Sequence, residues 1–243
     1  MAFYDQLFAR SPTRFGQDMN LRIARMHWGE LCRFAQDYSS LVEIGPGRGE
    51  FAATCLPMVQ RYSAVDVNEQ ICRMVRDLGG TAICATVPPL PFASNSAAIV
   101  YASSVIEHMP DPGKALQLLE EMKRVAQPGG LVAVHAPDIL ACGNHFWNSE
   151  YSHAFPTSRR RLLQMASDTG LVVLRTEYCY GPFRGFFGAA LGGAMRLFFS
   201  DHLASWATLG LVAPDRFYKT RTALLRSILL IARKPPLSEG KAV

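Results

Sequence analysis

The sequence lacks the cysteine pairs that are typical of disulfide frameworks and of many metal sites. Its six cysteines are scattered, no two of them form a C-x-x-C pair, and most lie in apolar segments. We therefore expect reduced, buried thiols in a cytoplasmic protein, and we predict no metal site.

A long uninterrupted hydrophobic run is also missing. Residues 1–18 include Asp5 and have no continuous apolar core, so we expect no secretory signal. The most apolar later stretch, residues 185–199, is broken by Arg196 and falls short of the ~20 apolar residues that span a bilayer. We therefore place the protein in the cytoplasm, with residues 183–213 as a candidate peripheral contact at the inner face of the membrane.

Repeats and low-complexity tracts are absent, and a chain of 243 residues that is 49% hydrophobic favours one α/β domain with an elaboration. Residues 1–40 carry five basic and four acidic groups, 41–138 carry seven and ten, and 139–243 carry thirteen and six, or net +1, −3 and +7. Such a basic region favours an anionic substrate or a membrane surface, and it is also common on a solvated face. Nucleic acid is disfavoured, because there is neither an N-P-P-Y-type motif nor a Lys/Arg stripe with stacking aromatics.

Apolar runs and helical periodicities alternate along the chain, which predicts a doubly wound, mostly parallel sheet. The expected strands are residues 41–45, 62–67, 81–85, 97–103, 131–137, 171–180 and 227–234. The expected helices are residues 20–38, 48–60, 68–80, 112–126 and 159–170. We divide the chain into an N-terminal helical cap, residues 1–40, and a main domain, residues 41–243, with 180–223 as an insertion or lid.

Three glycines follow the first expected strand, in "LVEIGPGRGEF". Their spacing is G-x-G-x-G, because Glu50 stands where the nicotinamide-binding pattern G-x-G-x-x-G requires glycine. No Gly-Lys-Ser/Thr follows, which also excludes a Walker loop. A bare turn between a strand and a helix leaves backbone N–H groups open to some other ligand.

Glu43-Ile-Gly45-Pro-Gly47-Arg-Gly49 resembles the E/D-x-G-x-G-x-G motif of class I S-adenosylmethionine-dependent methyltransferases. Asp66, at the end of the second strand, resembles that family's ribose-binding acid. The segments 90–92, 105–112 and 120–137 are similar to its later motifs, so that the resemblance covers roughly residues 38–178. It implies a Rossmann-like fold, a seven-stranded sheet with an antiparallel last strand, S-adenosyl-L-methionine as cofactor and S-adenosyl-L-homocysteine as product.

Carried over position by position, the resemblance implies ten cofactor-binding residues: Glu43, Gly45, Pro46, Gly47, Gly49, Asp66, Val67, Thr86, Val87 and Ser103. Glu43 would anchor the amino group of the cofactor, and the alternative is a carboxylate that stabilises the amides of its own loop. Thr86 departs from the aspartate that many relatives have, which leaves adenine recognition to its hydroxyl or to the backbone near Val87.

Methyl transfer to a hydroxyl needs a base with a pKa near neutrality, so histidines at the carboxyl ends of strands are the candidates. We predict His108 or His153 as the base, and we interpret His135, inside the fifth strand, as a core histidine. The loop "HFWNSEYSHAFPTS" resembles a segment of methyltransferases encoded with bacterial surface-glycan enzymes. It predicts an acceptor site, whose candidate residues are His145, Trp147, Tyr151 and Arg159.

The acceptor loop and the insertion also have purely structural interpretations. Phe146, Trp147 and Phe155 would then cover the edge of the sheet, and the arginines 159–161 would be a solvated first helical turn. The insertion 180–223 contains many large apolar residues interspersed with basic ones: Phe183, Phe186, Phe187, Leu191, Leu197, Phe198, Phe199 and Trp206, with Arg184, Arg196, Lys219 and Arg221. It is either a lid or oligomer interface, or a surface that meets lipid.

The sequence therefore favours an O-methyltransferase that acts on a sugar or sugar acid of a bacterial surface glycan. A second hypothesis is methylation of a small lipid-soluble acceptor such as a quinone or fatty acid, and it rests on the apolar insertion. A third, from another class, is a non-catalytic methyltransferase-like binding subunit, and the intact glycine loop and Asp66 argue against it.

Overall fold

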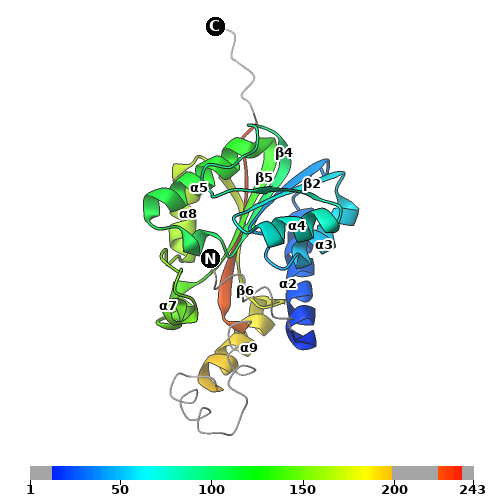
Figure 1. Cartoon of the computed structure of the whole chain (residues 1–243). Coiled ribbons are helices and arrows are strands. Elements are labelled where there is room, and N and C mark those ends of the chain that lie inside the picture. The colour runs from blue at the N-terminus through cyan, green and yellow to red at the C-terminus, as the bar shows by residue number, and fades with distance from the viewer. Residues whose placement is uncertain (1–12, 199–223, 237–243) are drawn as a thin grey trace.

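The computed structural model describes residues 13–198 and 224–236, which form one sheet with helices on both faces (Figure 1). The strands are β1 (Ser40–Ile44), β2 (Arg61–Asp66), β3 (Thr81–Cys84), β4 (Ala97–Ser103), β5 (Ala126–Pro137), β6 (Val172–Tyr180), β7 (Phe183–Arg184) and β8 (Arg226–Arg233). The α-helices are α2 (Arg14–Cys32), α3 (Glu50–Cys55), α4 (Glu69–Asp77), α5 (Pro112–Val125), α6 (Ile139–Cys142), α7 (His145–Ser149), α8 (Arg159–Asp168) and α9 (Gly185–Phe198). Two short 3-10 turns are η1 (Leu56–Met58) and η2 (Ile106–His108).

The strand order is β3-β2-β1-β4-β5-β8-β6-β7. Strands β1 to β5 pair in parallel, and β8 runs antiparallel to both β5 and β6. The predicted α/β architecture and the antiparallel last strand are therefore confirmed. The chain order reverses between β1 and β4, and in open α/β sheets ligands bind beyond the carboxyl ends of strands at such a point.

The sheet has one strand more than the seven predicted. After β6 the chain turns at Gly181-Pro182, and β7 pairs back through Cys179 with Arg184 and Tyr180 with Phe183. A strand of two residues is too short to give an alternating pattern in the sequence.

Successive residues of the central strands point to opposite faces and build two cores. Val42 and Ile44 belong to the core beneath α5 and α8, while Leu41 belongs to the core beneath α2, α3 and α4. Figure 1 shows these helices on either side of the sheet. Burial on both faces explains why the strands are almost continuously apolar.

Helix α2 differs from the predicted residues 20–38 at both ends. It begins earlier because Thr13 caps it, with the hydroxyl oxygen accepting from Gly16 N–H at 3.2 Å. It ends at Cys32, and Asp37 then accepts from Ser39 N–H at 2.7 Å in the turn that leads to β1. The buried Glu30 ties α2 to β6, with Oε2 3.3 Å from Arg175 Nε.

The predicted loop, residues 145–158, begins with the short helix α7, and another short helix, α6, precedes it. Asp138 caps α6 by accepting from Leu140 N–H at 3.2 Å, and it also binds Arg226 of β8. Ser158 caps α8, with its side-chain oxygen accepting from Arg161 N–H. Helices of four and five residues carry too few positions to show a helical period.

The insertion is described only in part. Its first residues form β7 and α9, on which Phe186 and Phe187 are 91% and 67% exposed. Residues 199–223, with Phe199, Trp206, Lys219 and Arg221, lie outside the described residues, as do residues 1–12. Among the helices that are described, none has both the length and the apolar character needed to cross a membrane.

All six cysteines lie in the described segments as free thiols. Cys55, Cys72 and Cys179 are buried, as expected, but Cys84 is exposed. The prediction of buried thiols is wrong for Cys84 because β3 is an edge strand, with exposed positions along most of its length.

Candidate functional site

The loop after β1 has a left-handed backbone at three glycines, with φ of +67° at Gly45, +55° at Gly47 and +81° at Gly49. A Cβ on Gly45 would lie 2.6 Å from Val105 Cγ2, and one on Gly49 would lie 2.5 Å from Met74 Sδ. A Cβ on Gly47 would meet no atom within 4 Å. Two of these glycines therefore allow close packing within the protein, and Gly47 leaves the backbone open to a ligand.

Glu43 lies buried in β1 just before this loop, with Oε2 accepting a hydrogen bond from the Tyr62 hydroxyl. Burial raises the pKa of the Glu43 carboxyl to about 8, while the Tyr62 bond opposes that rise and the charges of Glu50 and Asp66 add to it. The sequence did not indicate Tyr62, which reaches Glu43 from the neighbouring strand β2. Both roles predicted for Glu43, cofactor anchor and loop support, stay predictions.

Other predicted cofactor residues lie at the carboxyl end of β2 and beyond β3. Asp66 accepts from Asn68 N–H at 2.8 Å, and burial raises the pKa of its carboxyl against the hydrogen bonds from the Asn68 and Val67 amides. Val67 is 43% exposed, Thr86 is exposed and Val87 is half-buried. A carboxylate beside an exposed apolar side chain suits a ribose that carries a base.

We call residues 43–49, 66–67 and 86–87 the glycine-loop side. Pro46 closes its loop, since the Pro46 carbonyl accepts from Gly49 N–H at 2.9 Å. These three features fit the parts of S-adenosylmethionine. The open backbone at Gly47 suits its amino acid, the carboxylate of Asp66 suits its ribose, and the exposed Val67 suits its adenine base.

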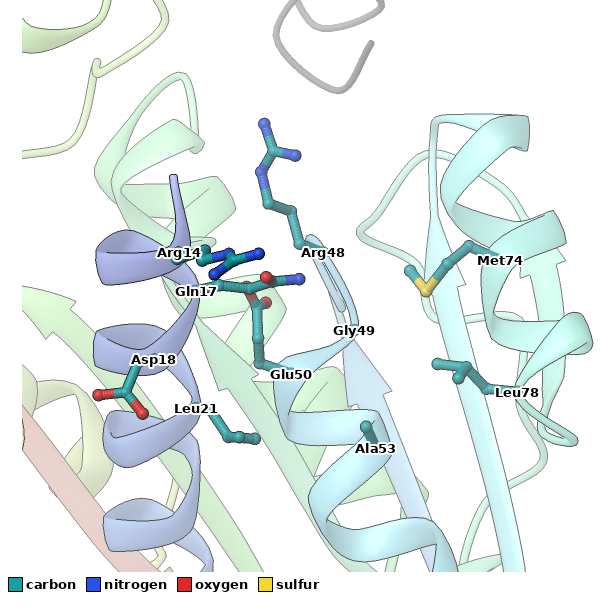
Figure 2. A pocket seen from close by; sticks show the side chains of 10 residues that line it. All are labelled: Arg14, Gln17, Asp18, Leu21, Arg48, Gly49, Glu50, Ala53, Met74 and Leu78. Atoms are coloured by element: carbon teal, nitrogen blue, oxygen red, sulfur yellow. The ribbon is translucent and has the colours of Figure 1, made fainter. Parts of the chain in front are cut away.

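A pocket of about 570 Å³ adjoins the loop from the side of α2. Figure 2 shows α2 and α4 on its two flanks, with the glycine loop and α3 between them. The polar side chains of Arg14, Gln17 and Arg48 gather near the loop, and Leu21 and Leu78 lie deeper along the helices. The N-terminal helix thus forms one wall of a space that reaches Gly49.

A second region, the histidine side, comprises residues 103–109 and 138–158 after β4 and β5. Its two segments are joined through the backbone, because the Glu107 carbonyl accepts from both Ala154 N–H and Phe155 N–H at 2.9 Å. This pairing brings His108 and His153 together, with ring centroids 5.0 Å apart. The two residues predicted as candidate bases are therefore neighbours, although 45 positions separate them.

Hydrogen bonds orient both imidazoles. His108 Nδ1 lies 3.0 Å from Ser152 Oγ, and the Ser152 hydroxyl donates to Glu150 Oε1 at 2.6 Å. His153 Nδ1 lies 2.7 Å from the Phe146 carbonyl oxygen, and its Nε2 lies 3.9 Å from Glu150 Oε2. Burial lowers the pKa of His108; Glu150 raises it, and His153 lowers it further.

Glu107, another residue of this region, was not predicted from the sequence. Its side chain is buried, and burial raises the pKa of the carboxyl to about 8 against the hydrogen bonds from its own amide and from Ser104. Glu107 Oε2 has no hydrogen-bond partner among the described residues. The position of Glu107 next to the candidate base His108 in the sequence could have identified it as a site residue.

The predicted acceptor residues have different surroundings. Trp147 and Tyr151 are 51% and 77% exposed, whereas His145 is buried at the start of α7. Arg159 is exposed and lies over the Tyr178 ring of β6, with its Cζ 5.5 Å from the centroid. The aromatic residues differ as well: Phe146 and Phe155 are buried, and Phe155 packs in the core beneath α5 and α8, whereas Trp147 is exposed.

Ser103 is half-buried and belongs to a polar chain that leads to the buried side chains of His27 and Tyr101. Its Oγ lies 2.9 Å from His135 Nδ1, the ring of His135 lies 4.3 Å from that of His27, and His27 Nδ1 is 2.6 Å from the Tyr101 hydroxyl. Burial lowers the pKa of His135 to about 4, so the ring is neutral, as the prediction of a core histidine requires. The contribution of His27 from α2 was not predicted.

Comparison with known proteins agrees with this geometry. Residues 42–134, from β1 to β5, match a family model described as a methyltransferase domain. An uncharacterized methyltransferase from Mycobacterium sp. (strain KMS) is 35% identical over 97 residues, which cover 39% of this chain and 37% of the relative. The matched part of the chain thus spans little more than a third of the length of that curated relative.

Solved structures extend the likeness to the fold. A SAM-dependent methyltransferase from Archaeoglobus fulgidus has a TM-score of 0.60 at 14% identity, over 88% of this chain and 94% of that one. The [4+2]-cyclase SpnF has a TM-score of 0.62 at 19% identity, over 88% and 81%. Such identities show a shared fold, and function must come from the site. Residues 42–134 are therefore similar to a methyltransferase domain, and the described chain has the Rossmann-like fold of S-adenosylmethionine-dependent methyltransferases.

Proposed function

We propose that the protein transfers a methyl group from S-adenosylmethionine to a hydroxyl of a sugar or sugar acid in a bacterial surface glycan. The observation that supports this most directly is the pair of imidazoles, His108 and His153, with ring centroids 5.0 Å apart beyond the carboxyl end of β4. Open α/β sheets bind their ligands at this edge.

When bound, the cofactor supplies an electrophilic methyl group on a sulfonium sulfur, which keeps the electron pair of the broken C–S bond. The chain must position the acceptor oxygen and take up its proton. His108 can do so through Nε2, since Nδ1 is engaged with Ser152. Burial lowers the pKa of His108, which favours the neutral form that a proton acceptor needs.

Exposed aromatic side chains beside these histidines support a carbohydrate acceptor. Trp147 and Tyr151 offer apolar faces on which the C–H groups of a sugar can stack, and Glu150 and Ser152 offer polar atoms nearby. Arg159, at the start of α8, adds a cation that suits a sugar acid. The net charge of +7 over residues 139–243, from thirteen basic and six acidic groups, agrees with an anionic acceptor.

A gene deletion tests the acceptor. We expect surface glycans of the deletion strain to lose the mass of one CH₂ group per methylated unit, and the wild-type gene to restore it. The Asp66→Ala variant should restore it poorly, since Asp66 is predicted to hold the cofactor. Unchanged glycan masses would show that the acceptor is not a surface glycan.

The exposed Phe186 and Phe187 of α9 favour a second candidate, a small lipid-soluble acceptor reached at a membrane surface. Co-sedimentation with anionic liposomes distinguishes the two. Strong binding that is lost in a Phe186→Ser/Phe187→Ser variant would support the lipid acceptor, and methylation of a soluble glycan would count against it.

A further inference from the structure

Three side chains of the histidine side converge in a way that proton transfer does not require. Glu107, His108 and His153 each place one ligand atom, an imidazole nitrogen or a carboxylate oxygen, within 4.8 Å of the other two. The Glu107 side chain is 1% exposed, and its Oε2 has no hydrogen-bond partner among the described residues. A buried carboxylate oxygen without a donor is costly unless something else binds it.

The hydrogen bonds of the two imidazoles leave Nε2 of each ring as the bare nitrogen. A carbonyl oxygen only accepts, so His153 Nδ1 donates to Phe146 across 2.7 Å. The hydrogen of the Ser152 hydroxyl goes to Glu150 at 2.6 Å, so its oxygen accepts from His108 Nδ1 at 3.0 Å. Histidine ligands of metals characteristically donate their other ring N–H to a carbonyl or to a carboxylate-linked group.

We propose that Glu107, His108 and His153 bind one divalent transition-metal cation of the zinc type. Two imidazoles and one carboxylate form a ligand set that leaves a coordination position open for water or substrate. Ligand atoms about 2.1 Å from a metal are at most about 4.2 Å apart, so small side-chain rotations from the observed spacing complete the site. Imidazole ligands favour zinc-type ions over magnesium and calcium.

The backbone keeps the three ligands in register. Glu107 and His108 belong to the 3-10 turn η2, and the Glu107 carbonyl holds the segment of His153 through Ala154 N–H and Phe155 N–H. Each ligand therefore comes from a segment fixed by main-chain hydrogen bonds. Fixed ligands reduce the ordering cost of binding.

A second group, Glu69, Cys72 and Cys84, also has ligand atoms within 4.8 Å of one another, but its surroundings are less suitable. Glu69 is already bound by Arg76, with Nη1 2.8 Å from Oε1. Both thiols lie close to backbone carbonyl oxygens, Cys72 to that of Asp66 and Cys84 to that of Val67. This thiol group serves as the internal control.

Cation binding does not depend on the proposed function, but one consequence does. A cation at this site would occupy the nitrogens of both candidate bases. If the proposed function holds, the acceptor hydroxyl would lose its proton because the cation lowers the pKa of an oxygen bound to it.

Cobalt(II) titration of the chelator-treated full chain, followed by visible absorbance, tests the site, and zinc competition gives the relative affinity. We expect saturation at one equivalent without thiolate-to-cobalt charge-transfer absorbance. Glu107→Gln and His108→Asn should abolish saturation, and Ser152→Ala, which removes only the partner of His108, should weaken it about 10- to 100-fold. Cys84→Ser should leave binding unchanged.

Each variant is accepted only if it binds S-adenosylhomocysteine as the wild type does, which shows that the domain is folded. No saturable binding to the wild type, or binding that depends on Cys84, would overturn the site. Methyl transfer in the presence of chelator, together with absent cobalt binding, would overturn the site and leave the proposed function standing. Cobalt binding in a protein that methylates no acceptor would support the metal site and overturn the proposed function.

Discussion

The glycine-loop side and the histidine side lie at the same edge of the sheet, but they are built by different means. The glycine-loop side depends on backbone conformation, with three left-handed glycines between β1 and α3. The histidine side depends on side-chain contacts between distant segments, such as His108 with Ser152 and Asp138 with Arg226. The first arrangement needs particular residue types at fixed spacing, whereas the second needs only that its partners meet in space.

The largest effect should come from breaking the ion pair that holds the histidine side. Asp138 is fully buried, and its Oδ2 accepts from Arg226 Nε at 2.7 Å and Nη2 at 2.6 Å. Arg226→Ala leaves that carboxylate buried and unpaired, so we expect the free energy of unfolding to fall by about 3–5 kcal/mol in urea denaturation. Arg226→Lys keeps a positive charge but loses the double contact, so its free energy of unfolding should lie between those of Arg226→Ala and the wild type.

The matched control is an exposed pair. Arg22 Nε lies 2.8 Å from Asp18 Oδ2 on α2, with side chains 63% and 60% exposed. Arg22→Ala should cost less than about 1 kcal/mol. Equal losses in the two arginine variants would show that the Asp138 contact does not hold the histidine side.

On the glycine-loop side, the free energy of unfolding should depend more on backbone conformation than on any charged group. Gly45→Ala combines a left-handed backbone, about 1–2 kcal/mol, with a contact against Val105, so we expect a loss of about 2–4 kcal/mol in the same denaturation. Gly47→Ala meets no atom and should cost only about 1–2 kcal/mol. Titration calorimetry should nevertheless find that Gly47→Ala binds S-adenosylmethionine weakly. Wild-type affinity in that variant would place the cofactor elsewhere.

The cofactor carboxylate offers a smaller and more specific change. Asp66→Ala should weaken S-adenosylmethionine binding by about 1–3 kcal/mol, because hydrogen bonds to a charged group are lost. Asp77→Ala, which removes an exposed carboxylate from the neighbouring α4, should leave the affinity unchanged. Calorimetric titration of both variants measures the difference, and similar affinities would misplace the ribose site.

The sequence predicted the glycine-loop side more completely than the histidine side. Strand β4 was predicted with its observed ends because seven apolar or small residues lie between turn residues, and Gly45, Gly47 and Gly49 were selected because their backbone excludes other residues. Spacing rules of this kind are local, so they can be recognised without a structure.

Contacts between segments were not accessible in the same way. Tyr62, His27 and Glu107 were missed because each acts through a partner on another strand, helix or loop. The helices α6 and α7 were missed because they have only four and five residues, and α6 begins at the Asp138 cap. Residue types alone do not specify such pairings.

Each side buries a glutamate side chain, which allows a last and direct comparison. Burial raises the pKa of both Glu43 and Glu107 to about 8 from a usual 4.5. Their protonated forms stabilise the folded state below pH 4.5, and this stabilisation is lost as the pH rises toward 8, because the unfolded chain gives up these protons first. The free energy of unfolding in chelator should therefore decrease with pH, by up to about 1.4 kcal/mol per pH unit for each group.

Denaturation between pH 5 and pH 8 measures this slope, and single variants divide it between the two sides. Glu43→Gln and Glu107→Gln each remove one titrating group and should each make the decrease shallower, while Glu120→Gln, on the exposed face of α5, should not change it. A change in only one of the two variants would mean that water reaches the other carboxyl. Zinc in place of the chelator should remove the contribution of Glu107 above pH 5, because a bound cation keeps this carboxylate ionised in the folded state, as it is in the unfolded chain.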